Sequence, residues 1–240
     1  MPHYYKGFLA VWRPLGGSYF WVTGQEAQEF KELDTAHFQS GLRLADVDFY
    51  DTLGTYTAIW RPGSGAQHWQ AWLSAQDFKQ QDDAQFQAGR RLAAIERSDD
   101  GVLGVWRTGN GGQRWVTGKS FDDVVDLDEQ LLPQGLRMTR LVRTNGSFTA
   151  VWRSGTGTER WHAGLTQSQF DSISLDYYTQ GLRIVSVDLA DGGYSAVWRP
   201  GSGAQWVHSG LTLAQLEAKD EQYKTDGLGL LTLKAKRYSS

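Results

Sequence analysis

The dipeptide Trp-Arg occurs five times at nearly constant spacing along this chain of 240 residues. Its copies are separated by 48, 46, 46 and 46 residues and are Trp12-Arg13, Trp60-Arg61, Trp106-Arg107, Trp152-Arg153 and Trp198-Arg199. A fixed period of this length is the signature of a repeat architecture, in which one supersecondary unit recurs along the chain. The sequence therefore predicts a single domain of five repeats, at about 5–51, 52–99, 100–144, 145–191 and 192–240.

The fourth repeat shows the unit most clearly. Asn145-Gly146 is a strong signal for a tight hairpin turn, and residues 148–153 after it are typical of a strand. The glycine-rich segment 154–157 predicts a second turn, because glycine permits the backbone angles that such turns need. Residues 160–163 are then the expected returning strand.

A helix of about 14 residues follows in each repeat. In the fourth repeat, Thr166 and Gln169 have the spacing of a capping box, and Gly181 is suited to the left-handed position after the helix. The equivalent helix-ending glycines are Gly41, Gly89, Gly135 and Gly227. A third strand at 182–189 completes the unit and is expected to pair with the first strand of the next repeat.

In this scheme, the strand at each end of the chain lacks one neighbouring strand. The opening strand, Gly7–Arg13, has no third strand before it, and the last strand, Leu230–Arg237, has no strand after it. Each would leave an open sheet edge, which invites aggregation. We therefore predict that these two strands pair. The expected fold is α+β, with five β-β-α-β units in a closed, pseudo-fivefold, propeller-like ring.

Composition narrows the classes of function. The net charge of −3 argues against nucleic acid as a partner, because nucleic-acid binding needs a concentrated basic surface. No apolar run approaches the roughly 20 residues of a membrane-spanning helix, and the first residues lack the apolar core of a signal peptide. A soluble, cytoplasmic protein is the default expectation, with export by a non-classical route as the alternative.

The tryptophans of the Trp-Arg pairs are expected to form the core, with their arginines along the sheets. A second interpretation is that Arg13, Arg61, Arg107, Arg153 and Arg199 line an axial channel and attract anions. The arginines after the helix-ending glycines, Arg43, Arg91, Arg137 and Arg183, are expected to be structural. Each would place its charge near a helix C-terminus, where an acidic partner is one option.

A second set of tryptophans lies eight or nine residues further on and is the better candidate for binding: Trp21, Trp69, Trp115, Trp161 and Trp206. Their polar neighbours include Gln67, Gln113, Glu159 and Gln205. An aromatic face beside hydrogen-bonding groups suits carbohydrate, although packing between the two tryptophan sets would also explain the pattern. Trp72 replaces a glycine found in the other four repeats, which indicates either a specialised site or drift.

Catalytic and metal-binding patterns are poor. No two of the five histidines have the spacing of a zinc helix, and cysteine is absent. The second repeat carries Trp72, Asp82 and Asp83, but the two aspartates share one helix, so a solvated helix face is the simpler interpretation. The sequence predicts no catalytic residue, metal or cofactor.

The segment 196–206 (AVWRPGSGAQW), with Ser209–Thr212 and Gln180–Arg183, resembles the bacterial tandem repeat domain family. Such repeats precede β-lactamase-like serine hydrolases, including fungal polyglycine hydrolases, where they are accessory and the hydrolase domain performs the chemistry. The Ser-x-x-Lys motif of that domain is absent here. The resemblance therefore implies a fold and carries no catalytic residue into this chain.

The leading hypothesis is a non-enzymatic, multivalent binding module for a glycan or glycoconjugate, similar to a lectin. A protein- or peptide-binding scaffold, with the turn tips as its contact surface, is the alternative. A hydrolase without a familiar motif is the third.

Overall fold

The computed structural model describes residues 5–50, 54–190 and 193–237 and has five helices and fifteen strands in that part of the chain. The first strands of the repeats are β1 (Tyr5–Arg13), β4 (Thr55–Pro62), β7 (Val102–Thr108), β10 (Ser147–Ser154) and β13 (Gly193–Pro200). The second strands are β2 (Phe20–Glu26), β5 (Gln67–Leu73), β8 (Gln113–Lys119), β11 (Arg160–Leu165) and β14 (Trp206–Leu211). The third strands are β3 (Leu42–Tyr50), β6 (Arg90–Arg97), β9 (Leu136–Thr144), β12 (Leu182–Ala190) and β15 (Gly229–Arg237).

The helices lie between the second and third strands, as the capping signals predict. They are α1 (Ala27–Gln39), α2 (Ala75–Gln87), α3 (Phe121–Leu131), α4 (Gln167–Thr179) and α5 (Leu213–Thr225), and a short 3-10 turn, η1 (Leu132–Gln134), extends α3. Thr166 caps α4 by accepting a hydrogen bond from the Gln169 amide, while the Gln169 side chain accepts one from the Thr166 amide. Gly181 has φ +80°, the left-handed conformation expected after the helix.

The strands form five antiparallel sheets of three strands each. In each sheet the first strand of one repeat lies between the second and third strands of the preceding repeat, as in the order β5-β7-β6. The predicted pairing of a third strand with the next first strand is therefore confirmed.

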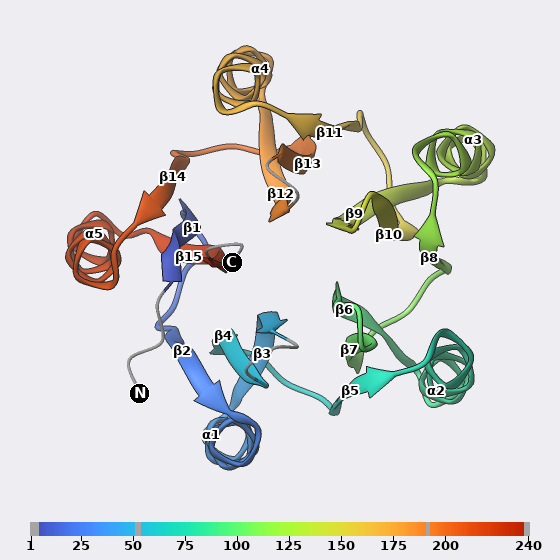
Figure 1. Ribbon diagram of the computed structural model, residues 1–240, viewed down its shortest axis with the longest axis horizontal. Coiled ribbons are helices and arrows are strands. Elements are labelled where there is room, and N and C mark those ends of the chain that lie inside the picture. The colour runs from blue at the N-terminus through green and yellow to red at the C-terminus, as the bar shows by residue number, and fades with distance from the viewer. Residues whose placement is uncertain (1–4, 51–53, 191–192, 238–240) are drawn as a thin grey trace. The chain divides into compact units, whose positions relative to one another are not determined.

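The sheet that contains both ends of the chain follows the same rule. Its order is β14-β1-β15, with Leu9 opposite Lys234 and Ala10 opposite Leu233 (Figure 1). The prediction that the last strand pairs with the first is confirmed: β1 has a strand on both sides, and β15 pairs with it along one edge.

The chain divides into two compact parts, each made of whole sheets. Residues 68–202 hold the three sheets centred on β7, β10 and β13, together with α2, α3 and α4. Residues 1–67 and 203–240 hold the sheets centred on β1 and β4, with α1 and α5. The single domain of five repeats stays a prediction.

The tryptophans of the Trp-Arg pairs form the core, as predicted. Trp12, Trp60, Trp106, Trp152 and Trp198 each have 0% of their surface exposed. In the α2 repeat, Trp106 packs on Phe78, with ring centroids 5.2 Å apart. Burying an aromatic ring of this size is among the largest apolar contributions that one residue makes to folding.

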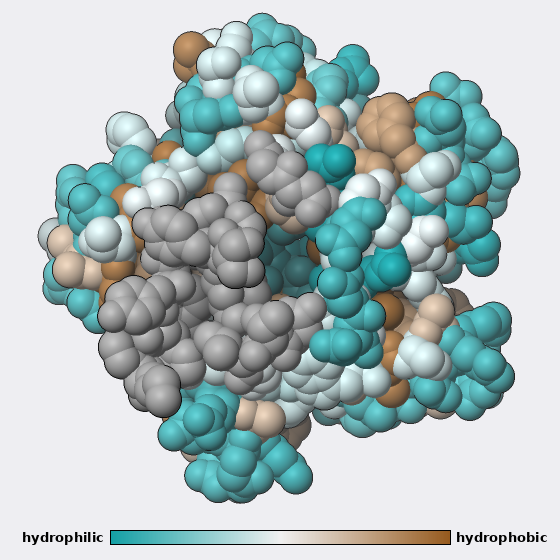
Figure 2. All heavy atoms as spheres, viewed as in Figure 1, coloured by the Kyte–Doolittle hydropathy of each residue, from teal (hydrophilic) through white to brown (hydrophobic). Residues whose placement is uncertain are grey.

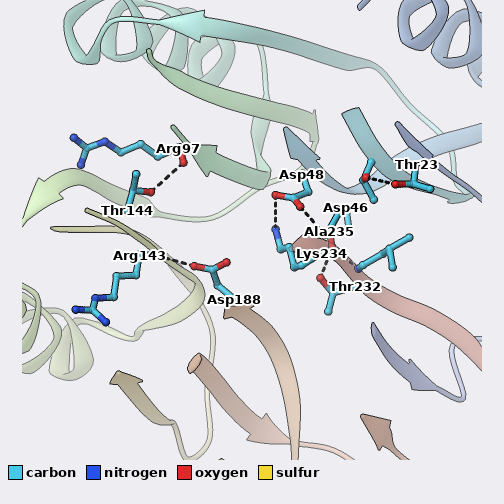
Figure 3. A network of polar contacts seen from close by, with 12 residues as sticks. Thr23, Asp46, Asp48, Arg97, Arg143, Thr144, Asp188, Thr232, Lys234 and Ala235 are labelled. Carbon is cyan, nitrogen blue, oxygen red and sulfur yellow. Dashed lines mark hydrogen bonds and ion pairs between the residues drawn. The ribbon is translucent and has the colours of Figure 1, made fainter. Parts of the chain in front are cut away.

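Aspartates of neighbouring strands bind backbone amides on two of the third strands, β15 and β9 (Figure 3). In one part of the chain, the Asp46 carboxylate on β3 accepts the Leu233 amide of β15 at 3.3 Å, and Asp48 accepts the Ala235 amide at 3.0 Å. In the other part, Asp188 on β12 accepts the Arg143 amide of β9 at 2.9 Å. These contacts satisfy edge groups that would otherwise attract another strand.

The arginine that follows each of the first four helices is structural, as predicted. Arg91 donates to the Phe86 carbonyl at the end of α2 and to the Gly111 carbonyl in the next turn, at 3.0 and 2.8 Å. Its guanidinium lies 3.4 Å from the Phe86 ring centroid. Its partners are carbonyls and a ring, and no acidic residue pairs with Arg91 in the described part of the chain.

Candidate functional site

A buried carboxylate joins the two tryptophan sets in the second repeat. Asp82 on α2 accepts hydrogen bonds from the indoles of Trp106 on β7 and Trp115 on β8, each at 2.8 Å. The Gln113 amide donates to the same carboxylate at 2.8 Å. We call Asp82, Trp106, Gln113 and Trp115 the α2 cluster. It connects the helix, its own sheet and the next sheet.

The helix period explains why Asp82 points inward. It stands four residues after Phe78, and positions four apart lie on one face of a helix. The interpretation of Asp82 and Asp83 as a solvated face is wrong for Asp82, which is 6% exposed. Asp83 is exposed and forms an ion pair with Lys79 at 2.6 Å. Burial raises the pKa of Asp82 despite its three donors.

The same arrangement recurs in three other repeats. Trp60 donates to Asp34 at 2.8 Å, Trp152 and Trp161 donate to Asp128 at 2.7 and 2.9 Å, and Trp12 and Trp21 donate to Asp220 at 3.0 and 2.7 Å. Burial opposes ionisation of Asp220, but hydrogen bonds from Lys224, Tyr19, Trp12 and Trp21 together lower its pKa. The α5 carboxylate therefore differs from Asp82 because a lysine is also bound to it, at 2.7 Å.

The fourth repeat lacks the carboxylate. Ser174 stands where the other helices have aspartate, again four residues after a buried aromatic, Phe170. The buried Trp198 indole nitrogen and Ser174 hydroxyl have no hydrogen-bond partner among the described residues. Val207 stands nine residues after Trp198, at the position of the second tryptophan in the other repeats. The acceptor and one of its donors are thus both missing from this repeat.

The grouping of Trp206 with the second tryptophan set is wrong. Trp206 lies opposite Trp12 in the sheet register, just as Arg160 lies opposite Trp198, so it occupies the position before the second tryptophan. It is 50% exposed and stacks on Tyr223 with ring centroids 5.8 Å apart. The other four members, Trp21, Trp69, Trp115 and Trp161, are half-buried.

A groove of about 530 Å³ opens beside the α2 cluster, between α2 and β8. Its lining residues are Lys79, Asp82, Asp83, Phe86, Gln87, Gln113, Arg114 and Trp115. Hydrophilic residues cover the outward side of α2, at the lower right of Figure 2. The groove volume is that of a small-molecule site, and one aromatic ring lies among donors and acceptors of both charges.

Trp115 is fixed in this groove by two contacts. Its indole nitrogen is bound to Asp82, and its ring meets Phe78 edge-on with centroids 4.6 Å apart. The sequence places Trp115 and Gln113 in a binding site, and the structure brings both to the groove. The contribution of Asp82 was missed, although an acidic residue recurs at one helix position in four repeats and would have marked it.

The residue seven positions after the Trp-Arg tryptophan connects the carboxylate to the sheet at Gln67 and Gln113. Gln113 donates to Asp82 and accepts the Leu92 amide at 2.7 Å, and Gln67 likewise joins Asp34 to the Leu44 amide at 2.6 Å. Glu159 holds this position beside Asp128 and accepts the Met138 amide. Burial and the neighbouring Asp128 raise the pKa of Glu159 from 4.5 to about 8. Glu159 is therefore protonated at neutral pH and takes the place of the glutamine amide.

Replacing Glu159 by glutamine is expected to remove a pH dependence of stability. Unfolding returns Glu159 to its ordinary pKa, so the folded protein holds an extra proton between pH 4.5 and about 8, and its stability falls as the pH rises through this window. We expect Glu159→Gln to match the wild type near pH 5 and to be more stable by about 1–2 kcal/mol near pH 9. Urea unfolding at both pH values measures this. Equal pH profiles for the two proteins would show that Glu159 is ionised throughout.

The five arginines of the Trp-Arg pairs are half-buried at the ends of their strands. Arg153 donates to the Leu92 and Asn110 carbonyls at 3.3 and 3.4 Å, and Arg199 donates to the Thr156 carbonyl at 2.9 Å. In residues 68–202 these side chains therefore reach from one repeat to the glycine-rich turn of the preceding repeat.

Trp72 has a strained backbone. Its φ is +61°, whereas glycines hold the equivalent positions with φ between +66° and +71°, at Gly24, Gly118, Gly164 and Gly210. A side chain in this conformation costs energy that glycine avoids. Trp72 is 38% exposed, so burial of its ring recovers only part of that cost.

Trp72→Gly is expected to raise the free energy of unfolding by about 1 kcal/mol, because it relieves the strain. Trp72→Ala is the matched control, since alanine removes the ring but keeps the Cβ atom and the strain. Denaturant titration of both variants would measure the difference. A less stable Trp72→Gly would mean that packing of the ring outweighs the strained backbone.

No protein family and no curated protein matches this chain in sequence. The described residues contain no group of three or more histidine, aspartate or glutamate side chains placed to hold a metal ion. None of the helices in the described ranges is long and apolar enough to cross a membrane.

Proposed function

We propose that this protein is a non-enzymatic, multivalent binding module and that the grooves between its repeats hold carbohydrate. The α2 groove carries the proposal. Trp115 offers a fixed aromatic ring for the C–H face of a sugar, and Arg114, Gln87 and Asp83 offer donors and acceptors for its hydroxyl groups. A sugar combines these two kinds of surface.

The charges in the groove favour a neutral saccharide. Lys79 and Asp83 neutralise each other, and the Arg114 charge is opposed by the nearby Asp82 carboxylate. Such a site has no net charge that would select a strongly acidic or basic ligand. Hydroxyl groups, which both donate and accept, fit this mixed lining.

We further propose that the five repeats close into a pseudo-fivefold, propeller-like ring. The proposal is supported by β1, which supplies the central strand of a sheet whose other two strands come from the last repeat. Several weak sites on one closed body would bind a glycan surface with avidity. The resemblance to accessory repeats of serine hydrolases also favours binding over catalysis.

A glycan array would test the carbohydrate proposal. We expect Trp115→Ala to weaken the apparent affinity for a multivalent glycan by about tenfold or more, because the protein loses one of its several binding sites. Arg114→Gln provides a second variant that leaves the α2 cluster intact, and Leu213→Ala, at an exposed apolar residue outside the groove, is the control. Absence of binding across a broad array, or binding that neither groove variant changes, would reject the proposal. Capture of a protein that competing sugars do not displace would favour the scaffold alternative.

A further inference from the structure

Two arginine guanidinium groups bind neighbouring carbonyls of one turn in residues 68–202, with Arg91 on the Gly111 carbonyl and Arg153 on the Asn110 carbonyl. A Cβ atom at Gly109 would lie 3.2 Å from Nη2 of Arg153 and 3.4 Å from Cγ of Arg91. Arg91 is 8% exposed, and Arg153 is half-buried. The absent side chain at Gly109 is what allows both arginines to approach the turn.

Among the residues that the structure describes, neither arginine has an acidic partner. Arg153 donates only to the Leu92 and Asn110 carbonyls, and Arg91 donates through Nε and Nη1 to carbonyls. No ion pair involves either of them in the part of the chain that the structure describes. Burial, and then the charge of Arg91, lower the pKa of Arg153. Two partly desolvated like charges at one turn repel each other, and an anion bound beside them would relieve this repulsion.

We propose that Arg91 and Arg153 form a binding site for an oxyanion, a sulfate or phosphate group that is either free or carried on a larger ligand. Guanidinium groups match the geometry of such oxyanions and remain charged at every physiological pH. The site is reachable, because the contact between Arg153 and the Asn110 carbonyl lies at the exposed surface. Neither arginine lines the α2 groove, but Arg91 stacks on Phe86 at the groove edge, and the anion site extends the proposed function.

The next repeat holds a natural comparison. A Cβ atom at Gly155 would lie 3.0 Å from Nη2 of Arg199 and 3.5 Å from Cγ of Arg137, so the second pair has the same geometry. When Glu159 is ionised, its charge acts on Arg199, whereas the first pair has the neutral Gln113 at that position. Above the Glu159 pKa of about 8, an oxyanion should therefore bind more tightly at Arg91 and Arg153, and Glu159→Gln should improve binding at the second pair.

Thermal unfolding in sodium sulfate or inorganic phosphate, against sodium chloride of equal ionic strength, tests the proposal. At saturating sulfate we expect the wild-type midpoint to rise by about 3–6 °C, Arg153→Gln to lose most of this rise, and Arg114→Gln to keep it. Arginine Nε–Hε NMR signals provide a second measurement, in which sulfate should shift Arg153 and Arg91 first. A sulfated oligosaccharide and its unsulfated parent distinguish a carried group from a free anion.

Two results would overturn the proposal. One is a sulfate response no larger than that of chloride in the wild type, and the other is an equal response in the wild type and Arg153→Gln. The anion proposal can hold even if no glycan on the array is bound, because the unfolding measurements in sulfate and phosphate use no glycan.

Discussion

Asp82→Ala is expected to lower the free energy of unfolding by about 3–4 kcal/mol, one of the two largest effects predicted for this protein. The substitution removes the acceptor of the Trp106 and Trp115 indoles and of the Gln113 amide. Trp106 is fully buried, so water does not replace the lost partner. Each buried donor left without a partner costs about 1–3 kcal/mol.

Asp83→Ala is the matched control, because it removes a carboxylate from the next position of the same helix. Asp83 forms only an exposed ion pair with Lys79, which is worth little, so its loss should change stability by about 0.5 kcal/mol or less. Ser174→Ala should also be nearly neutral, since the Ser174 hydroxyl already lacks a partner among the described residues. Urea unfolding of the three variants measures their free energies of unfolding. Equal effects of Asp82→Ala and Asp83→Ala would show that the α2 cluster contributes nothing to stability.

The second large effect is expected from deleting β15. Removing residues 229–240 takes away one of the two strands that pair with β1 and leaves one edge of β1 open along its length. The lost burial of Leu230 and Leu233 alone amounts to about 3–6 kcal/mol, which is comparable with the total stability of many domains. We expect the shortened chain to lose its cooperative unfolding transition and to aggregate through the exposed edge of β1.

A circularly rearranged variant tests whether β15 must follow α5 in the chain or need only be present beside β1. Moving residues 229–237 to the N-terminus, joined to β1 by a tight turn, restores the antiparallel neighbour from the other side of the chain. This variant should regain a cooperative unfolding transition. If the shortened chain unfolds with unchanged stability and cooperativity, the pairing of β1 with β15 is not what holds this sheet together.

Much of the fold could be predicted because its signals repeat. The Trp-Arg period, the capping pair Thr166 and Gln169, and the helix-ending Gly181 each act locally, and local signals survive in a single sequence. The pairing of β1 with β15 could be predicted because each of these strands lacked a neighbouring strand in the repeat pattern. Asp82 was missed because α2 is polar along most of its length, so a buried carboxylate does not stand out from the solvated residues around it.

The candidate site was harder to predict than the fold. Trp206 was grouped with Trp161 because the spacings differ by one residue, but a shift of one position in a strand turns a side chain to the opposite face. Arg91 and Arg153 are 62 residues apart, and nothing in their local sequence indicates that they meet. Contacts of this kind depend on how one repeat lies against the next, which the pattern within a repeat does not encode.

The central position of β1 in the sheet β14-β1-β15 also bears on how the protein is made. β1 leaves the ribosome well before its neighbour β15, whereas the sheet β5-β7-β6 can assemble from a short stretch of nascent chain. Throughout synthesis, β1 is exposed to four other strands that carry the same Trp-Arg sequence and could accept it wrongly. Because its neighbours are made late, β1 needs protection from wrong pairing for longer than β7 does.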